Sequence, residues 1–147
     1  MSNESGLTLV ELIIVIAILG IMAGAALPIA RFEVKRQKEK ELRRDLWEMR
    51  DAIDKYNDAA TKGAFQTKAD SFNYPPKLET LVDGETVGDK QLKFLREIPT
   101  DPMTGDKDWA LQSMQDEPGD AWGEQNVFDV HSKSKGTALD GTKYSDW

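Results

Sequence analysis

Hydrophobic residues are concentrated in one segment near the start of the chain. From Leu7 to Ala30 the residues are apolar, small or hydroxylated except for one carboxylate, Glu11, and the first basic residue is Arg31. A helix over residues 7–30 would be about 36 Å long at roughly 1.5 Å per residue, which is enough to cross the hydrocarbon core of a bilayer. The pattern therefore predicts a hydrophobic transmembrane helix over 7–30.

A second pattern follows in the more polar sequence after this segment. Apolar residues recur there at spacings of four and three positions: Leu42, Leu46, Met49, Ile53, Tyr56 and Ala60. This is the period of a helix with one apolar face, and Gly63 is a plausible stop. We expect an amphipathic helix over 31–63. We interpret its stripe as packing on the core of its own domain rather than as a seam between subunits.

The remainder of the chain, 64–147, is rich in loops. A short helix is expected near Leu78–Val82, and strands are expected at 109–114, at 126–132 and at the end, 142–147. These patterns predict an α+β fold. In it a long N-terminal helix, membrane-spanning in its first half and amphipathic in its second, packs on a small antiparallel β-sheet.

Composition narrows the function classes. The net charge is −7, so the chain offers no electrostatic basis for binding nucleic acid. It has no cysteine and one histidine, His131, which we interpret as an ordinary half-exposed side chain. A G-x-S-x-G elbow, a phosphate-cradling glycine motif and zinc-ligand spacing are all missing from the sequence. We therefore do not expect an enzyme.

Glu11 separates three interpretations of the apolar segment. A cleaved secretory signal would use the A-x-A-like site at 23–25, but the first five residues contain no Lys or Arg. An ordinary membrane anchor leaves Glu11 unexplained, because a carboxylate in mid-membrane costs about 3 kcal/mol. The third interpretation is a segment that packs against copies of itself. A cut between Gly6 and Leu7 would leave an α-amino group able to pair with Glu11 of the same or a neighbouring chain.

The start of the chain resembles the leader and N-terminal helix of type IV pilins and type II secretion pseudopilins. The resemblance rests on "SGLTLVELIIVIAILGIMAGAALP", with Gly6 at the cleavage position. Counting from Leu7, Glu11 is the fifth residue and Pro28 the twenty-second, as in that family. Leu7 replaces the usual Phe, and the leader lacks its usual basic residues. Farther on, "YPPKLETL", "FLREIPTDPMTGDKDW" and "FDVHSKSKGTALDG" are similar to parts of the major pseudopilin of type II secretion.

This resemblance implies a pilin-like domain organisation. Residues 1–6 would be a prepilin leader removed by prepilin peptidase, leaving an N-methylated Leu7. Residues 7–30 would form the transmembrane and assembly helix, with Glu11 and Pro28 as assembly residues, and 31–63 would continue into a globular part completed by 64–147. Basic residues after the segment would by charge bias alone predict the reverse orientation. The resemblance implies a periplasmic C-terminal domain.

The function implied is that of a structural subunit of a type II secretion pseudopilus in the inner membrane. The subunit would polymerise through its N-terminal helix to drive protein export. Its partners would be copies of itself, minor pseudopilins, the inner-membrane assembly platform and prepilin peptidase. One alternative is a type IV or competence pilin for adhesion, motility or DNA uptake. Another, of a different class, is a monomeric membrane-anchored periplasmic binding module.

The closing loop has two interpretations. Ser132, Asp140 and Asp146 offer hard oxygen ligands of the kind that calcium uses, although the spacing is not that of an EF-hand. Asp140-Gly141 is also a strong turn pair that needs no ion. Major pseudopilins carry a calcium ion in this loop. The resemblance therefore implies calcium as a cofactor, with these three residues as candidate ligands.

Overall fold

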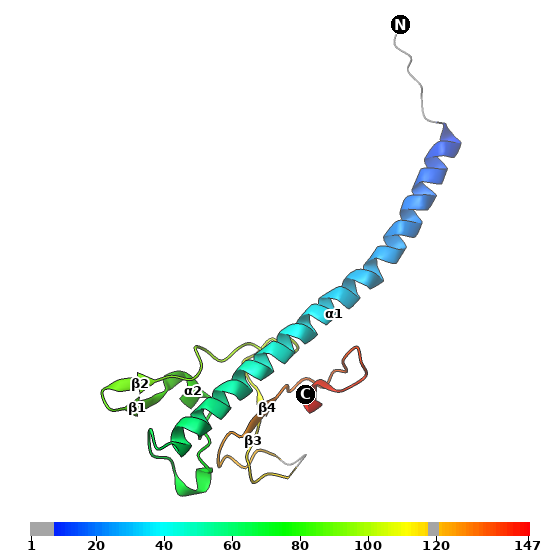
Figure 1. Cartoon of the computed structure of the whole chain (residues 1–147). Coiled ribbons are helices and arrows are strands. Elements are labelled where there is room, and N and C mark those ends of the chain that lie inside the picture. Colours follow the sequence, from blue (N-terminus) through cyan, green and yellow to red (C-terminus); the bar gives the residue numbers. More distant parts are fainter. Residues whose placement is uncertain (1–7, 118–120) are drawn as a thin grey trace. The chain divides into compact units, whose positions relative to one another are not determined.

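The computed structural model describes residues 8–117 and 121–147, with the backbone alone at 25–29. The chain divides into two compact units, Met1–Gln37 and Lys38–Trp147, which we describe separately. Helix α1 (Leu9–Thr61) contributes residues to both units (Figure 1). The expected leader 1–6 and the processing residues Gly6 and Leu7 lie outside the described residues.

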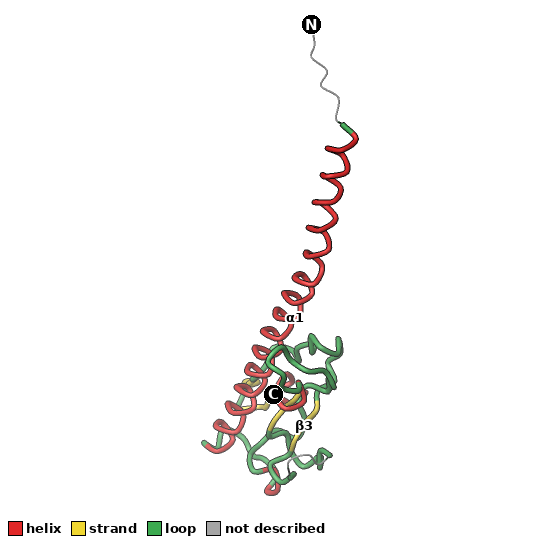
Figure 2. The backbone as a smooth tube through the Cα atoms, turned by 90° about the vertical axis from the view of Figure 1, so that its right-hand side faces the viewer, coloured by secondary structure: helices red, strands yellow, loops and turns green. Residues whose placement is uncertain are grey.

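The second unit combines the C-terminal part of α1 with short elements joined by loops (Figure 2). These elements are η1 (Ala69–Ser71), α2 (Glu79–Asp83), β1 (Glu85–Val87), β2 (Lys90–Leu92), β3 (Ala110–Gln112), β4 (Asp129–His131) and η2 (Tyr144–Asp146). β1 pairs with β2 and β3 pairs with β4, both antiparallel. A long N-terminal helix with small antiparallel sheets confirms the predicted α+β class.

The C-terminal end of α1 lies where the sequence predicts it. Gly63 has a φ of 77°, a left-handed conformation that favours glycine. Its N–H donates to the carbonyl of Ala60 at 2.9 Å, and the N–H of Ala64 donates to the carbonyl of Ala59 at 3.0 Å. These two bonds form a Schellman motif, which satisfies carbonyls at the helix end.

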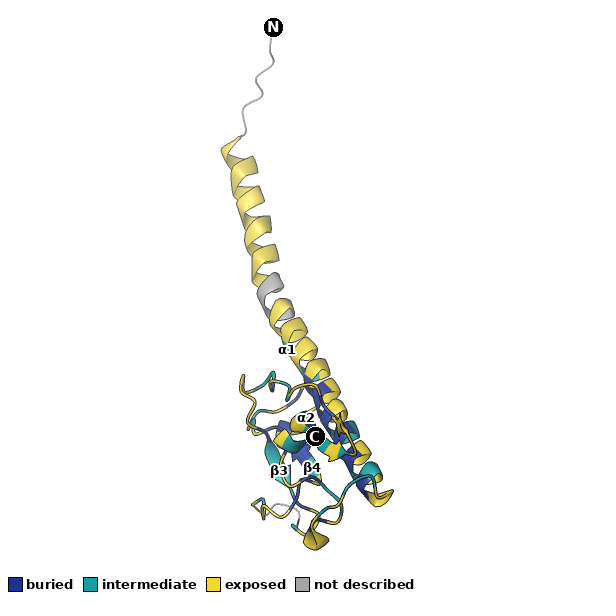
Figure 3. Cartoon of the chain, turned by 90° about the vertical axis from the view of Figure 1, so that its left-hand side faces the viewer, coloured by how far each residue is buried: buried dark blue, intermediate teal, exposed yellow. Residues whose placement is uncertain are grey.

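The core of the second unit forms around the predicted stripe of α1. All six stripe residues are buried, and Figure 3 shows the buried surface of α1 facing the short elements. They pack against buried residues from later in the chain: Leu78, Leu81, Leu95, Trp109, Val127, Val130, Ala138 and Tyr144. Burial removes apolar surface from water and is the main favourable term in folding. The interpretation of this stripe as a packing face of its own domain is confirmed.

The predicted strand over 142–147 is wrong. Residues 144–146 form the 3₁₀ helix η2 instead, and only an isolated bridge joins Thr137 to Lys143. The local hydrogen bond from the N–H of Asp146 to the carbonyl of Lys143, 3.1 Å long, replaces a strand ladder. This turn allows the ring of Tyr144 to enter the core, where its hydroxyl donates to Glu39 Oε1 at 3.0 Å.

The β1–β2 hairpin was not predicted, because its residues lack an alternation of apolar and polar positions. Each strand has three residues, and all three residues of β2 are exposed. Gly84, before β1, is required by its surroundings. Its φ is 80°, and a Cβ there would lie 2.4 Å from the carbonyl oxygen of Leu92. The hairpin lies beside α2, since Gln91 donates to the carbonyl of Asp83 at 2.6 Å.

Candidate functional site

Glu11 lies in the first turn of α1, next to the residue that caps the helix. The N–H of Glu11 donates to Thr8 Oγ1 at 3.2 Å, and the N–H of Leu12 donates to the carbonyl of Thr8 at 3.1 Å. Thr8 is therefore an N-cap whose hydroxyl satisfies one otherwise unpaired backbone donor. The carboxylate of Glu11 lies at the positive end of the helix dipole, where negative charge is favourable.

The capping role of Thr8 was missed by sequence reasoning. Thr8-x-x-Glu11 has the spacing of a capping box, a pattern that marks a helix start when it precedes an apolar run. Glu11 thus has a local role within its own chain, in addition to the predicted pairing with an α-amino group. The two roles are compatible, because capping through Thr8 uses the backbone of Glu11 and leaves its carboxylate exposed.

The helix that carries Glu11 exposes its apolar side chains. Large hydrophobic residues from Leu9 to Met22 are all exposed in the first unit (Figure 3). A Cβ added at Gly20 or at Gly24 would meet no atom within 4 Å, so no contact in the described part of this chain requires these glycines. Position 28 is helical, while the side chain of Pro28 lies outside the described residues. Within the described residues, no helix combines the length and apolar character required for a membrane span.

The three candidate calcium ligands of the closing loop have separate partners. Ser132 is buried and donates to Asp101 Oδ2 at 2.6 Å. Asp140 Oδ1 accepts from Thr142, and its Oδ2 pairs with the guanidinium of Arg43 at 3.2 Å. Asp146 Oδ1 accepts from the hydroxyl of the residue before it at 2.9 Å.

Each of these three side chains is engaged by a different group of the chain. Within residues 8–117 and 121–147, no group of three or more His, Cys, Asp or Glu side chains is placed to hold a metal ion. The hydrogen bonds from Thr142, followed by the charge of Arg43, lower the pKa of Asp140. The turn at Asp140-Gly141 is closed by a backbone hydrogen bond, in which the N–H of Ala138 donates to the carbonyl of Thr142 at 2.7 Å. Calcium binding stays a prediction.

The last residues of the chain are held by a cluster around Arg50. Its Nε donates to Asp129 Oδ1 at 2.6 Å, and its Nη2 donates to the carbonyls of Val130 at 3.0 Å and Trp147 at 2.7 Å. His131 Nδ1 lies 2.9 Å from the same carbonyl of Trp147. His131 is half-buried and belongs to this cluster, which fits its interpretation as a structural side chain.

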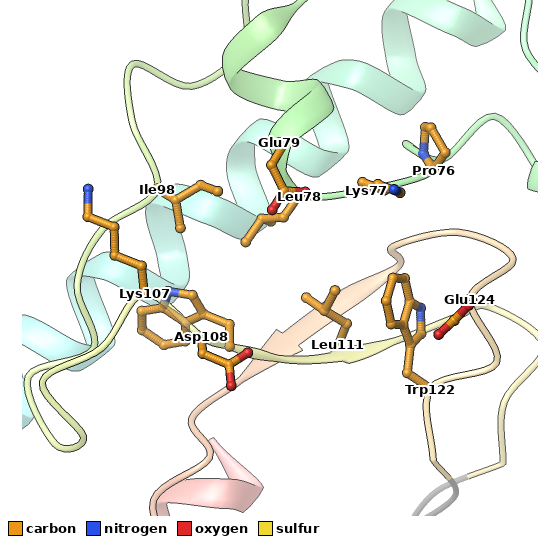
Figure 4. A pocket seen from close by; sticks show the side chains of 11 residues that line it. Pro76, Lys77, Leu78, Glu79, Ile98, Lys107, Asp108, Leu111, Trp122 and Glu124 are labelled. Atoms are coloured by element: carbon orange, nitrogen blue, oxygen red, sulfur yellow. The ribbon is translucent and has the colours of Figure 1, made fainter.

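The second unit also contains a pocket of about 620 Å³. Figure 4 shows Leu78 and Glu79 on one side of it and Leu111 and Trp122 on the other. Its remaining lining residues are Pro76, Lys77, Ile98, Lys107, Asp108, Trp109 and Glu124. Six of the eleven lining residues are apolar and five are charged. The pocket was not predicted, because its residues come from distant parts of the chain.

One comparison with known proteins identifies the start of the chain. Residues 1–27 match the family described as the prokaryotic N-terminal methylation motif. This motif is a prepilin-type signal, and it indicates a type IV pilin-like protein whose precursor is processed by prepilin peptidase. Proteins with this motif are structural rather than enzymatic. No curated protein and no solved structure matches the chain.

Proposed function

We propose that this protein is a structural subunit of a type II secretion pseudopilus. The observation that carries the proposal is the match of residues 1–27 to the N-terminal methylation motif. The precursor is inserted in the inner membrane with its C-terminal part in the periplasm, cleaved between Gly6 and Leu7, and methylated on Leu7. Its mechanism is assembly, and it carries out no chemistry of its own.

The exposed side chains of the first unit support polymerisation. Apolar residues from Leu9 to Met22 remain exposed, and copies packed side by side would cover them. Gly20 and Gly24 are four residues apart, which permits close helix approach in lipid. The carboxylate of Glu11 pairs with the new α-amino group of a neighbouring chain, so that the burial of each charge is offset by the other.

Intact-mass analysis of the mature protein tests the processing step. The expected mass is that of residues 7–147 with one added methyl group. A Gly6→Leu variant is the matched control, and it should keep its first six residues because the peptidase site is lost. Cleavage after Ala25 in the wild type, or a wild-type chain that retains its first six residues, would contradict the proposal.

Deletion of the gene distinguishes secretion from the related pilin functions. Loss of exported proteins from the medium with unchanged surface fibres supports the pseudopilus and its partners, the minor pseudopilins and the assembly platform. Loss of adhesion, motility or DNA uptake with normal export supports a type IV or competence pilin instead. A wild-type subunit that gives no crosslinks between copies through its N-terminal helix would support a membrane-anchored binding module.

A further inference from the structure

We propose that Trp47 of one copy inserts into the pocket beside Trp122 of the next copy, so that the second units form a head-to-tail contact. The inference rests on the proposed assembly and adds a contact outside the apolar helix. Three observations carry it: an exposed indole without a hydrogen-bond partner, a pocket with free acceptors, and complementary charge.

Trp47 is an unusually exposed aromatic side chain on α1. Its exposed fraction is 68%, although Leu46 and Met49 beside it are buried in the core. Among the described residues, none accepts a hydrogen bond from its indole N–H. Tryptophan is enriched at protein interfaces because its large ring buries much area and its N–H finds an acceptor there.

The two tryptophans of the pocket differ from Trp47 in this respect. The indole N–H of Trp109 donates to the carbonyl of Pro99 at 3.0 Å, and that of Trp122 donates to the carbonyl of Asn126 at 2.8 Å. Their donors are satisfied within the chain, so their rings serve as apolar walls. The pocket therefore has an aromatic lining whose indole N–H groups already donate to acceptors within the chain.

The rim of the pocket supplies acceptors for a tryptophan that enters it. Glu79 and Glu124 line the pocket, and neither has an ion-pair partner within the described part of the chain. Glu124 has a φ of 60°, an uncommon conformation for a residue other than Gly, Asn or Asp. Residues held in such conformations cluster at binding sites, where the surroundings fix them.

Charge favours this pairing over contact between two identical surfaces. Lys40, Arg43 and Arg44 precede Trp47 by seven, four and three residues, so its face of the helix is basic on the N-terminal side, while Asp51 and Asp54 follow on the C-terminal side. Arg43 and Arg44 have exposed ion pairs within the chain, whereas Lys40 has none in the described part. Among the lining residues of the pocket, Glu79, Glu124 and Lys77 have no ion-pair partner in the described part of the chain, which leaves a net negative charge there.

Trp47, which we call the knob, and the pocket beside Trp122 are formed by different residues of the same chain. Trp47 borders a hollow formed with Arg43, Leu46, Arg50 and Trp147, none of which lines the pocket of Trp122. A contact between two different surfaces of identical chains is heterologous, and it generates an open-ended filament when the rotation does not close a ring. This geometry suits a polymer.

Cysteine crosslinking of the full chain in its own membrane tests the contact, because the natural chain contains no cysteine. One copy carries Glu48→Cys beside the knob and one epitope tag. The other carries Lys77→Cys at the pocket rim and a second tag. We expect oxidised dimers that carry both tags. Adding Trp47→Ala to the first copy should lower their yield by at least about tenfold, the effect of losing an interface anchor.

Two control pairs make the result interpretable. Glu48→Cys with Lys90→Cys, an exposed position on β2, should give background dimers only. Ile16→Cys in both copies reports packing of the apolar helices. Phe72→Ala removes another exposed aromatic side chain and should leave the Glu48–Lys77 dimers unchanged.

Each outcome decides between the two proposals. If the Ile16 dimers form while the Glu48–Lys77 pair stays at the background of the Lys90 pair, the docking of Trp47 is overturned and helix assembly stands. If neither forms, helix assembly fails and the docking fails with it. Dimers that persist undiminished with Trp47→Ala also overturn the assignment of the knob.

Discussion

Replacing Arg50 by methionine should detach the last residues of the chain from α1. Arg50 donates from α1 to Asp129 of β4 and to the carbonyls of Val130 and Trp147, with distances of 2.6–3.0 Å for the three shortest bonds. Methionine keeps an apolar stem of similar length but donates none of these hydrogen bonds. The substitution therefore removes the polar contacts with little loss of packing.

The size of the expected destabilisation depends on how far the side chains of Arg50 and Asp129 are exposed to solvent. A hydrogen bond to a charged group contributes about 1.5–3 kcal/mol, and breaking a fully buried ion pair costs about 3–5 kcal/mol. The side chains of Arg50 and Asp129 are 36% and 24% exposed, so solvent screens part of the interaction. We expect Arg50→Met to lower the free energy of unfolding by about 2 kcal/mol. Most of this loss comes from Asp129 and two carbonyls that lose the hydrogen bonds donated by Arg50.

Urea unfolding of the full-length protein in detergent, followed by near-ultraviolet circular dichroism, measures this loss. Lys55→Met is the matched control, because Lys55 pairs with Asp51 on the exposed surface of the same helix. Such a pair contributes about 0.3–0.5 kcal/mol. A double-mutant cycle with Asp129→Asn should give a coupling free energy on the order of 1 kcal/mol. If Arg50→Met destabilises no more than Lys55→Met, the cluster does not hold the end of the chain.

Three further predictions concern capping, pH and calcium. Glu11→Ala should insert in the membrane as well as wild type but give few filaments in negative-stain counts. Thr8→Ala is the control, because it removes the cap and keeps the carboxylate of Glu11. If Thr8→Ala reduces the filament yield equally, loss of helix capping explains the defect of Glu11→Ala. Burial and the hydrogen bond to Glu39 raise the pKa of Tyr144 to about 12, so its stabilisation is intact below pH 10 and is lost as pH rises through 12. Tyr144→Phe should make the melting temperature fall less over that window, and equal slopes for the two proteins would contradict this. If calcium binds the closing loop, millimolar calcium should raise the melting temperature relative to chelator, and Asp140→Ala should abolish the rise; identical wild-type curves would exclude the site.

The helical parts of the fold follow from the sequence because their signals are local. The stripe from Leu42 to Ala60 repeats over five turns, and Gly63 adds a stop with a physical reason, its positive φ. The strands β3 and β4 lie inside their predicted ranges. By contrast, the segment 142–147 has a strand-like composition, but a contact with Glu39 far away in the sequence decides its conformation.

The residues of the candidate site likewise fall into those that the sequence could predict and those that it could not. A short motif predicts Gly6, Leu7 and Glu11 as site residues, and the capping role of Thr8 could have been predicted from its spacing to Glu11 in the same stretch. The pocket beside Trp122 could not be predicted from the sequence, because it combines residues of α2, β3 and the loops around them. The partners of Ser132 and Asp140 were hidden for the same reason, since Asp101 and Arg43 lie 31 and 97 residues away.

The cluster around Arg50 has a consequence for the order of folding. It joins Arg50 to a carbonyl 97 residues later, and Glu39 accepts hydrogen bonds from residues 100 and 105 positions later. Contacts of such high sequence separation carry a large loop-closure entropy and form late. The contacts of Glu39 and Arg50 therefore complete the second unit only after the residues from Leu139 to Trp147 have been synthesised.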